Sequence, residues 1–309
     1  MGGWKAWVTT ALLGLSACEQ SPFREVHVDI RPVQAEVLPL ARPATATTKP
    51  FRVSVAGMES PSGTYAAWSR LFGEVAHRLG GGMELEFVQR RTYAEVNELL
   101  MKGELDAALL CTGGYLELQR RDPGAVEVVA VPIINGSDAY QSLIIVPASS
   151  QAQSLRQLEG RRFAFTDELS LTGRAWVVHE LRAQGKTPET FFGATSFTRS
   201  HDRSVSAVAR GVVDGASVHS IVFQHLLEKD PALLDKVRVI QRSPEFGMTP
   251  VVASQKLSRG TRAGLREVLL ELSEDPEGAA LLSSLRINRF ALALPGLFDS
   301  AYDVVQPAP

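Results

Sequence analysis

Hydrophobic and polar positions alternate along the chain between strand-like and helix-like patterns. Residues 51–55 alternate as in a strand, and apolar residues from Trp68 to Leu79 recur at helical spacing. The same pattern predicts strands over 84–88 and 105–110, with a helix over 93–101 that ends at Gly103. Largely apolar strands are typical of a parallel sheet covered on both faces, so this half of the chain predicts an α/β lobe.

The alternation restarts after further strands at 126–132 and 140–146. A strand over 162–165 leads to a polar turn and a helix, and a second polar turn leads to a helix over 204–210. The segment 211–216 then repeats the character of 103–108, in which a glycine ends a helix and a strand bearing an aspartate follows. Two α/β lobes of similar construction are the simplest interpretation.

The two polar turns carry the candidate chemistry. In the first, Ser170, Thr172 and Gly173 lie between a strand and a helix, where backbone N–H groups, the helix dipole and hydroxyls can hold an anion. Ordinary helix capping also explains this turn when it is taken alone. The second turn places His201 and Asp202 at the start of another helix. The presence of both turns favours a shared binding site.

Composition narrows the class of partner. The chain has 309 residues, of which 45% are hydrophobic and 21% charged, which suits a globular protein with room for two lobes. The formal net charge of -2 gives no basic field for nucleic acid. The sequence has no Walker loop, Rossmann glycine fingerprint or zinc motif, so we expect a small-molecule ligand and neither a cofactor nor a bound metal.

The N-terminus has the pattern of an export signal over residues 1–17. Lys5 precedes an apolar run over 8–15 that is too short to span a bilayer, and Leu-Ser-Ala-Cys at 15–18 resembles the lipobox of bacterial lipoproteins. That resemblance implies cleavage before Cys18 and lipidation of its sulfur. Residues 18–50 are rich in Pro, Ala and Thr and predict a lipidated flexible tether. The same residues are also compatible with an ordinary secretory signal and a coincidental cysteine.

Only one further cysteine, Cys111, is present, so lipidation of Cys18 leaves it without an intramolecular disulfide partner. We therefore expect Cys111 to be a small buried hydrophobe. Glu19 is not the aspartate often linked to inner-membrane retention, which favours a periplasmic lipoprotein of the outer membrane.

Residues 51–305 resemble the phosphate, phosphite and phosphonate substrate-binding proteins of ABC transporters, the PhnD-like family of type 2 periplasmic binding proteins. The resemblance rests on the order and spacing of seven features, which are 103–108, 140–146, 154–165, 170–173, 200–205, 211–216 and the ending at Tyr302. Each is weak alone, but their order is specific. The resemblance implies lobe 1 over 51–145 plus 250–309 and lobe 2 over 146–249, each a mostly parallel sheet flanked by helices. Segments 140–146 and 248–253 would cross between the lobes as a hinge.

The resemblance also implies how a ligand is held. Turn hydroxyls, a histidine and lobe 1 tyrosines surround a tetrahedral anion in this family, which transfers to the ligand-binding residues Tyr65, Tyr115, Ser170, Thr172, Gly173, His201 and Asp202. Leu171 departs from the family by replacing a hydroxyl in the turn. Ile221, beside Ser220, and Thr249 stand where binders of aminated phosphonates have carboxylates. An unpaired ammonium in a closed site is costly, so an aminoalkyl ligand is disfavoured.

These observations predict a monomeric solute-binding lipoprotein that delivers a small phosphorus oxyanion to an ABC permease and catalyses nothing. A hydrolase using Ser170, His201 and Asp202 is disfavoured, because adjacent His and Asp residues pair poorly as base and orienter and a Gly-x-Ser-x-Gly elbow is missing from the sequence. The sequence leaves two further functions open, a sensory protein coupled to a membrane histidine kinase and a scaffold that binds no ligand.

Overall fold

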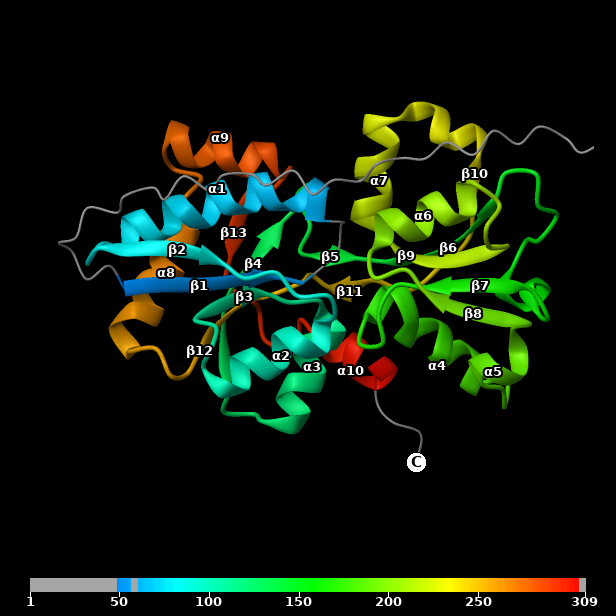
Figure 1. The fold of residues 1–309 in the computed structure, drawn as a ribbon, viewed down its shortest axis with the longest axis horizontal. Coiled ribbons are helices and arrows are strands. Elements are labelled where there is room, and N and C mark those ends of the chain that lie inside the picture. The colour runs from blue at the N-terminus through cyan, green and yellow to red at the C-terminus, as the bar shows by residue number, and fades with distance from the viewer. Residues whose placement is uncertain (1–48, 57–60, 306–309) are drawn as a thin grey trace, which may run out of the picture. The chain divides into compact units, whose positions relative to one another are not determined.

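The structure is a computed structural model that describes residues 49–56 and 61–305 (Figure 1), all within one compact unit. The predicted signal peptide, Cys18 and nearly all of the tether lie outside the described residues. Lys49 and Pro50, at the end of the predicted tether, already belong to the first strand.

The first sheet contains six strands in the order β13-β4-β12-β3-β1-β2. Their bounds are β1 Lys49–Val55, β2 Met83–Phe87, β3 Ala107–Leu109, β4 Val126–Ile133, β12 Val251–Ser254 and β13 Arg289–Ala291. Helices cover both faces, with α1 and α9 on one side and α2 and α3 on the other (Figure 1). The helices of this part are α1 Pro61–Leu79, α2 Tyr93–Lys102, α3 Thr112–Arg121, α8 Arg259–Glu271 and α9 Pro276–Ser284.

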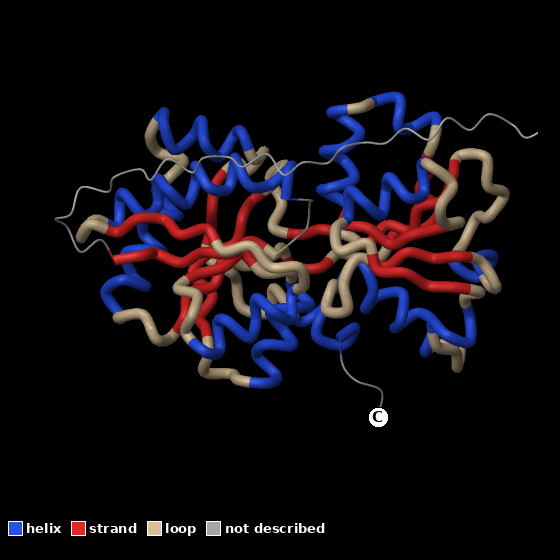
Figure 2. Tube along the Cα trace, in the orientation of Figure 1, coloured by secondary structure: helices blue, strands red, loops and turns tan. Residues whose placement is uncertain are grey.

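The second sheet contains five strands in the order β10-β6-β9-β7-β8. Their bounds are β6 Ser142–Pro147, β7 Arg162–Phe165, β8 Ala194–Phe197, β9 Gly215–His219 and β10 Val237–Arg242. Its helices are α4 Trp176–Arg182, α5 Pro188–Phe191, α6 His201–Ala209 and α7 Ser220–Lys229, with short 3-10 helices η1 Leu155–Leu158 and η3 Pro231–Asp235 and a π-helix η2 Leu171–Ala175. Figure 2 shows these strands between two layers of helices.

Both sheets are mixed: as predicted, most strands of each sheet run in one direction, and a minority run against it. In the first sheet β1 runs parallel to β2 and β3, whereas β12 runs antiparallel to β3 and β4. In the second, β7 is parallel to β8 and β9, whereas β6 is antiparallel to β9 and β10. β6 and β12 each enter a sheet directly after the chain has come from the other one, whereas β13, which is antiparallel to β4, follows α9 of the same part.

Two short segments join the sheets. β5 Ala139–Tyr140 pairs antiparallel with β11 Phe246–Gly247, immediately before the chain enters β6 and shortly before it enters β12. The hydroxyl of Thr112 at the start of α3 donates to the Gly247 carbonyl at 2.9 Å and ties α3 to this ladder. The C-terminal helix α10 Asp299–Val305 contacts α3 and β11 as well as η2 and α4. Helix α10 therefore packs both against α3, beside the first sheet, and against η2 and α4, beside the second sheet.

Local sequence signals account for the ends of α2. Thr92 forms a capping box with Glu95, and Gly103 ends the helix in the left-handed conformation with φ 70. Cys111 is buried, as predicted. None of the helices in the described ranges is both long and apolar enough to cross a bilayer.

Candidate functional site

The first polar turn is built around Gly173. A Cβ atom at this position would lie 2.5 Å from Thr166 Cβ and 2.8 Å from Ser170 Oγ, so a larger residue does not fit. The tight turn lets the Ser170 hydroxyl accept the Gly173 N–H at 3.0 Å, which caps η2. Capping therefore explains Ser170. It does not explain Thr172, whose buried hydroxyl has no hydrogen-bond partner among the described residues.

His201 is fully buried as the first residue of α6. Its Nδ1 accepts the backbone N–H of His219 at 3.1 Å and lies 3.0 Å from the Thr166 hydroxyl. Because Nδ1 accepts, the ring proton is on Nε2. Burial lowers the pKa of His201 to about 3, so the imidazole is neutral at physiological pH. Its Nε2 is buried and has no partner within the described chain.

His219 repeats this arrangement at the start of α7. Its Nδ1 accepts the Ile221 N–H at 3.2 Å, which again leaves the proton on Nε2. Burial lowers its pKa well below the usual value. The His219 ring stacks on Tyr140 with centroids 4.2 Å apart and lies 5.7 Å from the His201 ring. This Nε2 is likewise buried and unpartnered in the described part of the chain.

Two tyrosines that the sequence did not single out complete the arrangement. Tyr93 is the first residue of α2 and Tyr140 lies in β5; both are 2% exposed, and neither buried hydroxyl has a partner among residues 49–56 and 61–305. Burial raises the pKa of both phenols, which therefore stay protonated and able to donate. Tyr93 lies beside the first turn, because its N–H donates to Asp167 at 3.3 Å. The missed signal for Tyr140 was its place in the segment 140–146.

We call these five residues the donor cluster, and its members are Tyr93, Tyr140, Thr172, His201 and His219. A buried donor without a partner costs about 1–3 kcal/mol, and native proteins keep few of them. All five groups can donate a hydrogen bond, and they come from elements attached to both sheets. Helix α2 begins at Tyr93, α6 begins at His201 and α7 begins directly after His219. The positive ends of three helix dipoles are thus at the cluster, which suits an anion.

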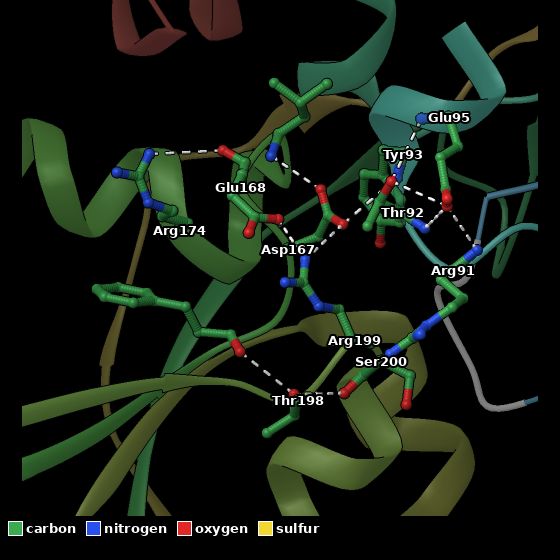
Figure 3. Close-up of polar contacts among 12 residues, drawn as sticks. Arg91, Thr92, Tyr93, Glu95, Asp167, Glu168, Arg174, Thr198, Arg199 and Ser200 are labelled. Carbon is green, nitrogen blue, oxygen red and sulfur yellow. Dashed lines mark hydrogen bonds and ion pairs between the residues drawn. The ribbon is translucent and has the colours of Figure 1, made fainter. Parts of the chain in front are cut away.

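A buried carboxylate connects the first turn to α2 (Figure 3). Asp167, 1% exposed, accepts the Leu169 N–H through Oδ1 at 2.9 Å and the Tyr93 N–H through Oδ2 at 3.3 Å. Arg199, in the left-handed conformation with φ 68, lies 3.6 Å from Asp167 Oδ2 and also pairs with Glu168. Burial raises the pKa of Asp167. Both carboxylate oxygens are already engaged by N–H groups.

Helix α3 approaches the same turn without room for a side chain. A Cβ atom at Gly113 would lie 2.4 Å from the Leu169 carbonyl oxygen and 2.8 Å from the Leu171 nitrogen. Leu171, the apolar residue of this turn, is fully buried in the apolar core. The Leu171 side chain therefore packs into the hydrophobic core.

With this geometry in place, comparison with known proteins identifies the family. The sequence profile of the periplasmic phosphonate substrate-binding proteins of ABC transporters matches residues 53–295. The chain belongs to this family. It is 24% identical to the phosphonates-binding periplasmic protein of Escherichia coli (strain K12) over 241 residues, which cover 77% of this chain and 70% of that protein.

Two further relatives have solved structures. The probable phosphite-binding protein PhnD1 of Prochlorococcus marinus (strain MIT 9301) is 26% identical over 202 residues, covering 61% of this chain and 67% of that protein. Its structure in complex with methylphosphonate gives a TM-score of 0.71 at 18% identity, over 83% of this chain and 97% of that one. The binding component of an ABC phosphonate transporter from Pseudomonas aeruginosa gives 0.73 at 20% identity, over 83% and 85%. These similarities confirm the two-sheet α/β fold of type 2 periplasmic binding proteins.

Not every residue predicted for the phosphonate-binding site joins the donor cluster. Ser170, Thr172, Gly173 and His201 lie together at the first turn and α6. Tyr65, in contrast, is 49% exposed and packs against Phe87 with centroids 5.3 Å apart. Tyr115 packs against Phe298, 5.1 Å away. Asp202 is half-buried as the second residue of α6, where its charge favours the helix dipole. Tyr65 and Tyr115 are not members of the donor cluster, and their contact with a ligand stays a prediction.

The hydrogen bonds of His201 differ from those of a catalytic histidine in a Ser-His-Asp hydrolase. A Ser-His-Asp hydrolase needs a carboxylate on the histidine Nδ1. His201 Nδ1 instead faces the His219 N–H and the Thr166 hydroxyl. In the part of the chain that the structure describes, no three His, Cys, Asp or Glu side chains gather as metal ligands.

Proposed function

We propose that this chain captures a small phosphorus oxyanion, such as phosphite, phosphate or an alkylphosphonate, and delivers it to an ABC permease without changing it chemically. The observation that carries the proposal is the donor cluster, because its five buried atoms lack partners that an oxyanion would supply. Each hydrogen bond to a charged group contributes about 1.5–3 kcal/mol. The family and the methylphosphonate complex of the relative PhnD1 support the same ligand class.

The binding is proposed to work without a cationic side chain in the donor cluster. Both imidazoles are neutral and both phenols are protonated, so the cluster offers oriented dipoles. Three helix N-termini add partial positive charge at the same place. Such a site binds a desolvated oxyanion well, because its hydrogen-bond donors already point at the anion and do not have to reorient as water molecules do.

We infer that binding is coupled to closure of two lobes, 51–145 plus 250–309 and 146–249. Tyr93 and Tyr140 precede the strand β6, whereas Thr172, His201 and His219 follow it, so a ligand held by all five touches both lobes. Such contacts exist together only in the closed arrangement, which the ligand therefore favours. The ladder of β5 and β11 is the natural hinge between the lobes.

The family is periplasmic, and we propose that this member is a monomeric lipoprotein anchored through Cys18 after removal of residues 1–17. Residues 18–50 would tether the body, with the outer membrane favoured by Glu19. Cys18→Ser should move the protein from the membrane to the soluble fraction, whereas Cys111→Ala, at a buried site outside the leader, should leave it on the membrane. Unchanged partitioning of Cys18→Ser would reject the lipid anchor.

A thermal-shift panel tests the binding function. The full chain, purified in detergent, is heated with phosphite, phosphate, methylphosphonate, sulfate or a sulfonate. A ligand at a hundredfold over its dissociation constant stabilises the folded state by about 2.7 kcal/mol, a shift of several degrees. We expect the phosphorus oxyanions to give the shift. A cooperative unfolding transition that none of them moves would contradict the proposal.

A further inference from the structure

A cavity of about 110 Å³ adjoins the donor cluster at His219, which lines it. Its walls come from both sides of the molecule and include Trp68 of α1, Leu109 of β3 and Ile221 of α7. His219 also stacks on Tyr140 and carries one of the unpartnered donors. A ligand whose oxyanion is held by the donor cluster therefore has space for a substituent on the His219 side.

The cavity is apolar over most of its wall, and a few ionisable side chains line its edge. Ile134 and Met248 join the three apolar side chains already named. The ionisable lining residues are His219, His225, Lys229 and Arg286, and the described part of the chain contributes no aspartate or glutamate to the lining. Arg286 pairs with Glu228, which does not itself line the cavity. A substituent with an ammonium group would lose its hydration here without gaining a carboxylate partner from the lining, which is costly. A hydrocarbon substituent would gain from leaving water.

We propose that the ligand is an organic phosphonate whose uncharged substituent of about three to five carbon atoms fills this cavity. The inference rests on the proposed function and narrows it from small oxyanions in general to those with an apolar group. The size follows from volume, because a protein cavity of roughly 150 Å³ admits benzene. The cavity of about 110 Å³ therefore suits a group slightly smaller than that ring.

Calorimetric titration of the full chain with three matched phosphonates tests this proposal. Methylphosphonate, propylphosphonate and 3-aminopropylphosphonate share the oxyanion and differ only in the substituent. Burial of each methylene raises affinity about fourfold, so propylphosphonate, with two more methylenes, should bind about fifteenfold more tightly than methylphosphonate. We expect 3-aminopropylphosphonate to bind at least tenfold more weakly than propylphosphonate, since its ammonium finds no carboxylate among the described residues that line the cavity.

Two substitutions in the cavity lining test whether the cavity causes the preference for propylphosphonate over 3-aminopropylphosphonate. Ile221→Glu places a carboxylate on the lining and should reduce or reverse the preference for propyl over aminopropyl. Lys229→Glu does the same at an exposed position, where the substitution is tolerated by the fold. Leu234→Glu is the matched control, because Leu234 is 59% exposed and does not line the cavity. The control should keep the wild-type order of affinities.

The outcomes separate this inference from the proposed function. Equal affinities for methylphosphonate and propylphosphonate, or tight binding of 3-aminopropylphosphonate, would overturn the inference and leave oxyanion binding intact. A preference that both lining variants leave unchanged would also overturn it. Folded protein that binds none of the three phosphonates, nor phosphite or phosphate, would contradict the proposed function itself.

Discussion

The Asp167 carboxylate accepts the backbone N–H of Tyr93 at 3.3 Å, across 74 residues of sequence. Asp167 belongs to the turn that carries Thr172, and Tyr93 opens helix α2. The contact thus fixes the start of α2 relative to the turn, and with it the positions of two donor-cluster hydroxyls. In a two-lobed binding protein this bond would form on closure.

Asp167→Asn should weaken oxyanion binding about tenfold, because both oxygens of Asp167 accept from N–H groups. An asparagine amide would direct its NH₂ at either Leu169 N–H or Tyr93 N–H and lose that hydrogen bond, worth about 1–3 kcal/mol. Titration calorimetry gives the affinity. Glu168→Gln removes the neighbouring charge, which also pairs with Arg199, and should have little effect. Equal losses of affinity in both variants would mean that the negative charge in this turn matters and that the two hydrogen bonds of Asp167 do not.

Gly113→Ala should weaken ligand binding at least tenfold while barely changing the melting temperature of the ligand-free protein. The added methyl would meet the Leu169 carbonyl oxygen at 2.4 Å, and that oxygen is backbone that cannot rotate away. Separation of α3 from the turn relieves the overlap, so an open arrangement is favoured without loss of either lobe.

Gly114→Ala is the matched control for that substitution. Its Cβ would lie 3.7 Å from Tyr93 Cβ, an ordinary contact. We expect wild-type affinity from this variant. If Gly113→Ala also binds as the wild type does, the close approach of α3 to the turn is not required for binding.

The buried His201 predicts a pH dependence of stability. Its pKa is lowered to about 3, whereas an unfolded histidine titrates near 6.5. Below pH 6.5 the histidine binds a proton in the unfolded chain but not in the folded state. The free energy of unfolding therefore falls as the pH falls towards 3. Two pH units below 6.5 the loss amounts to about 2 to 3 kcal/mol.

Urea unfolding of wild type and His201→Gln at pH 7 and pH 4.5 isolates this contribution. The shift of Asp167, whose raised pKa acts in the opposite direction, is present in both proteins and cancels in the difference. The shift of His219 is caused mainly by its burial, which both proteins share, so it largely cancels as well. We expect the wild type to lose about 2 to 3 kcal/mol relative to the variant between these pH values. A difference that does not change with pH would show that His201 titrates normally.

Local sequence signals predicted much of the fold. The apolar spacing of α1, the glycine that ends α2 and the strand at 126–132 all correspond to observed elements. The hydrophobic pattern could not show which strands run against the others, because periodicity reports which face of a strand is buried and carries no information about the order in which a chain enters a sheet. β6 and β12 reverse direction for that topological reason.

The donor cluster could be predicted only in part, because local sequence pattern does not show which distant residues tertiary packing brings together. Ser170, Thr172 and His201 follow strands or open helices, so their positions could be inferred from local pattern. Tyr93 occupies an apolar position on α2 and looks like core until its hydroxyl is found buried without a partner among the described residues. Tyr140 and His219 are brought together by a stack between residues 79 positions apart, which is set by tertiary packing.

The most direct test of the account is the affinity of Thr172→Val for methylphosphonate, measured by calorimetry beside the free energy of unfolding. The Thr172 hydroxyl has no partner within residues 49–56 and 61–305, so its removal should leave the ligand-free protein as stable as the wild type or more so. Binding should weaken at least tenfold. Thr195→Val, at an exposed position of β8, should change neither quantity. Wild-type affinity in Thr172→Val would contradict the claim that the unpaired donors hold the oxyanion.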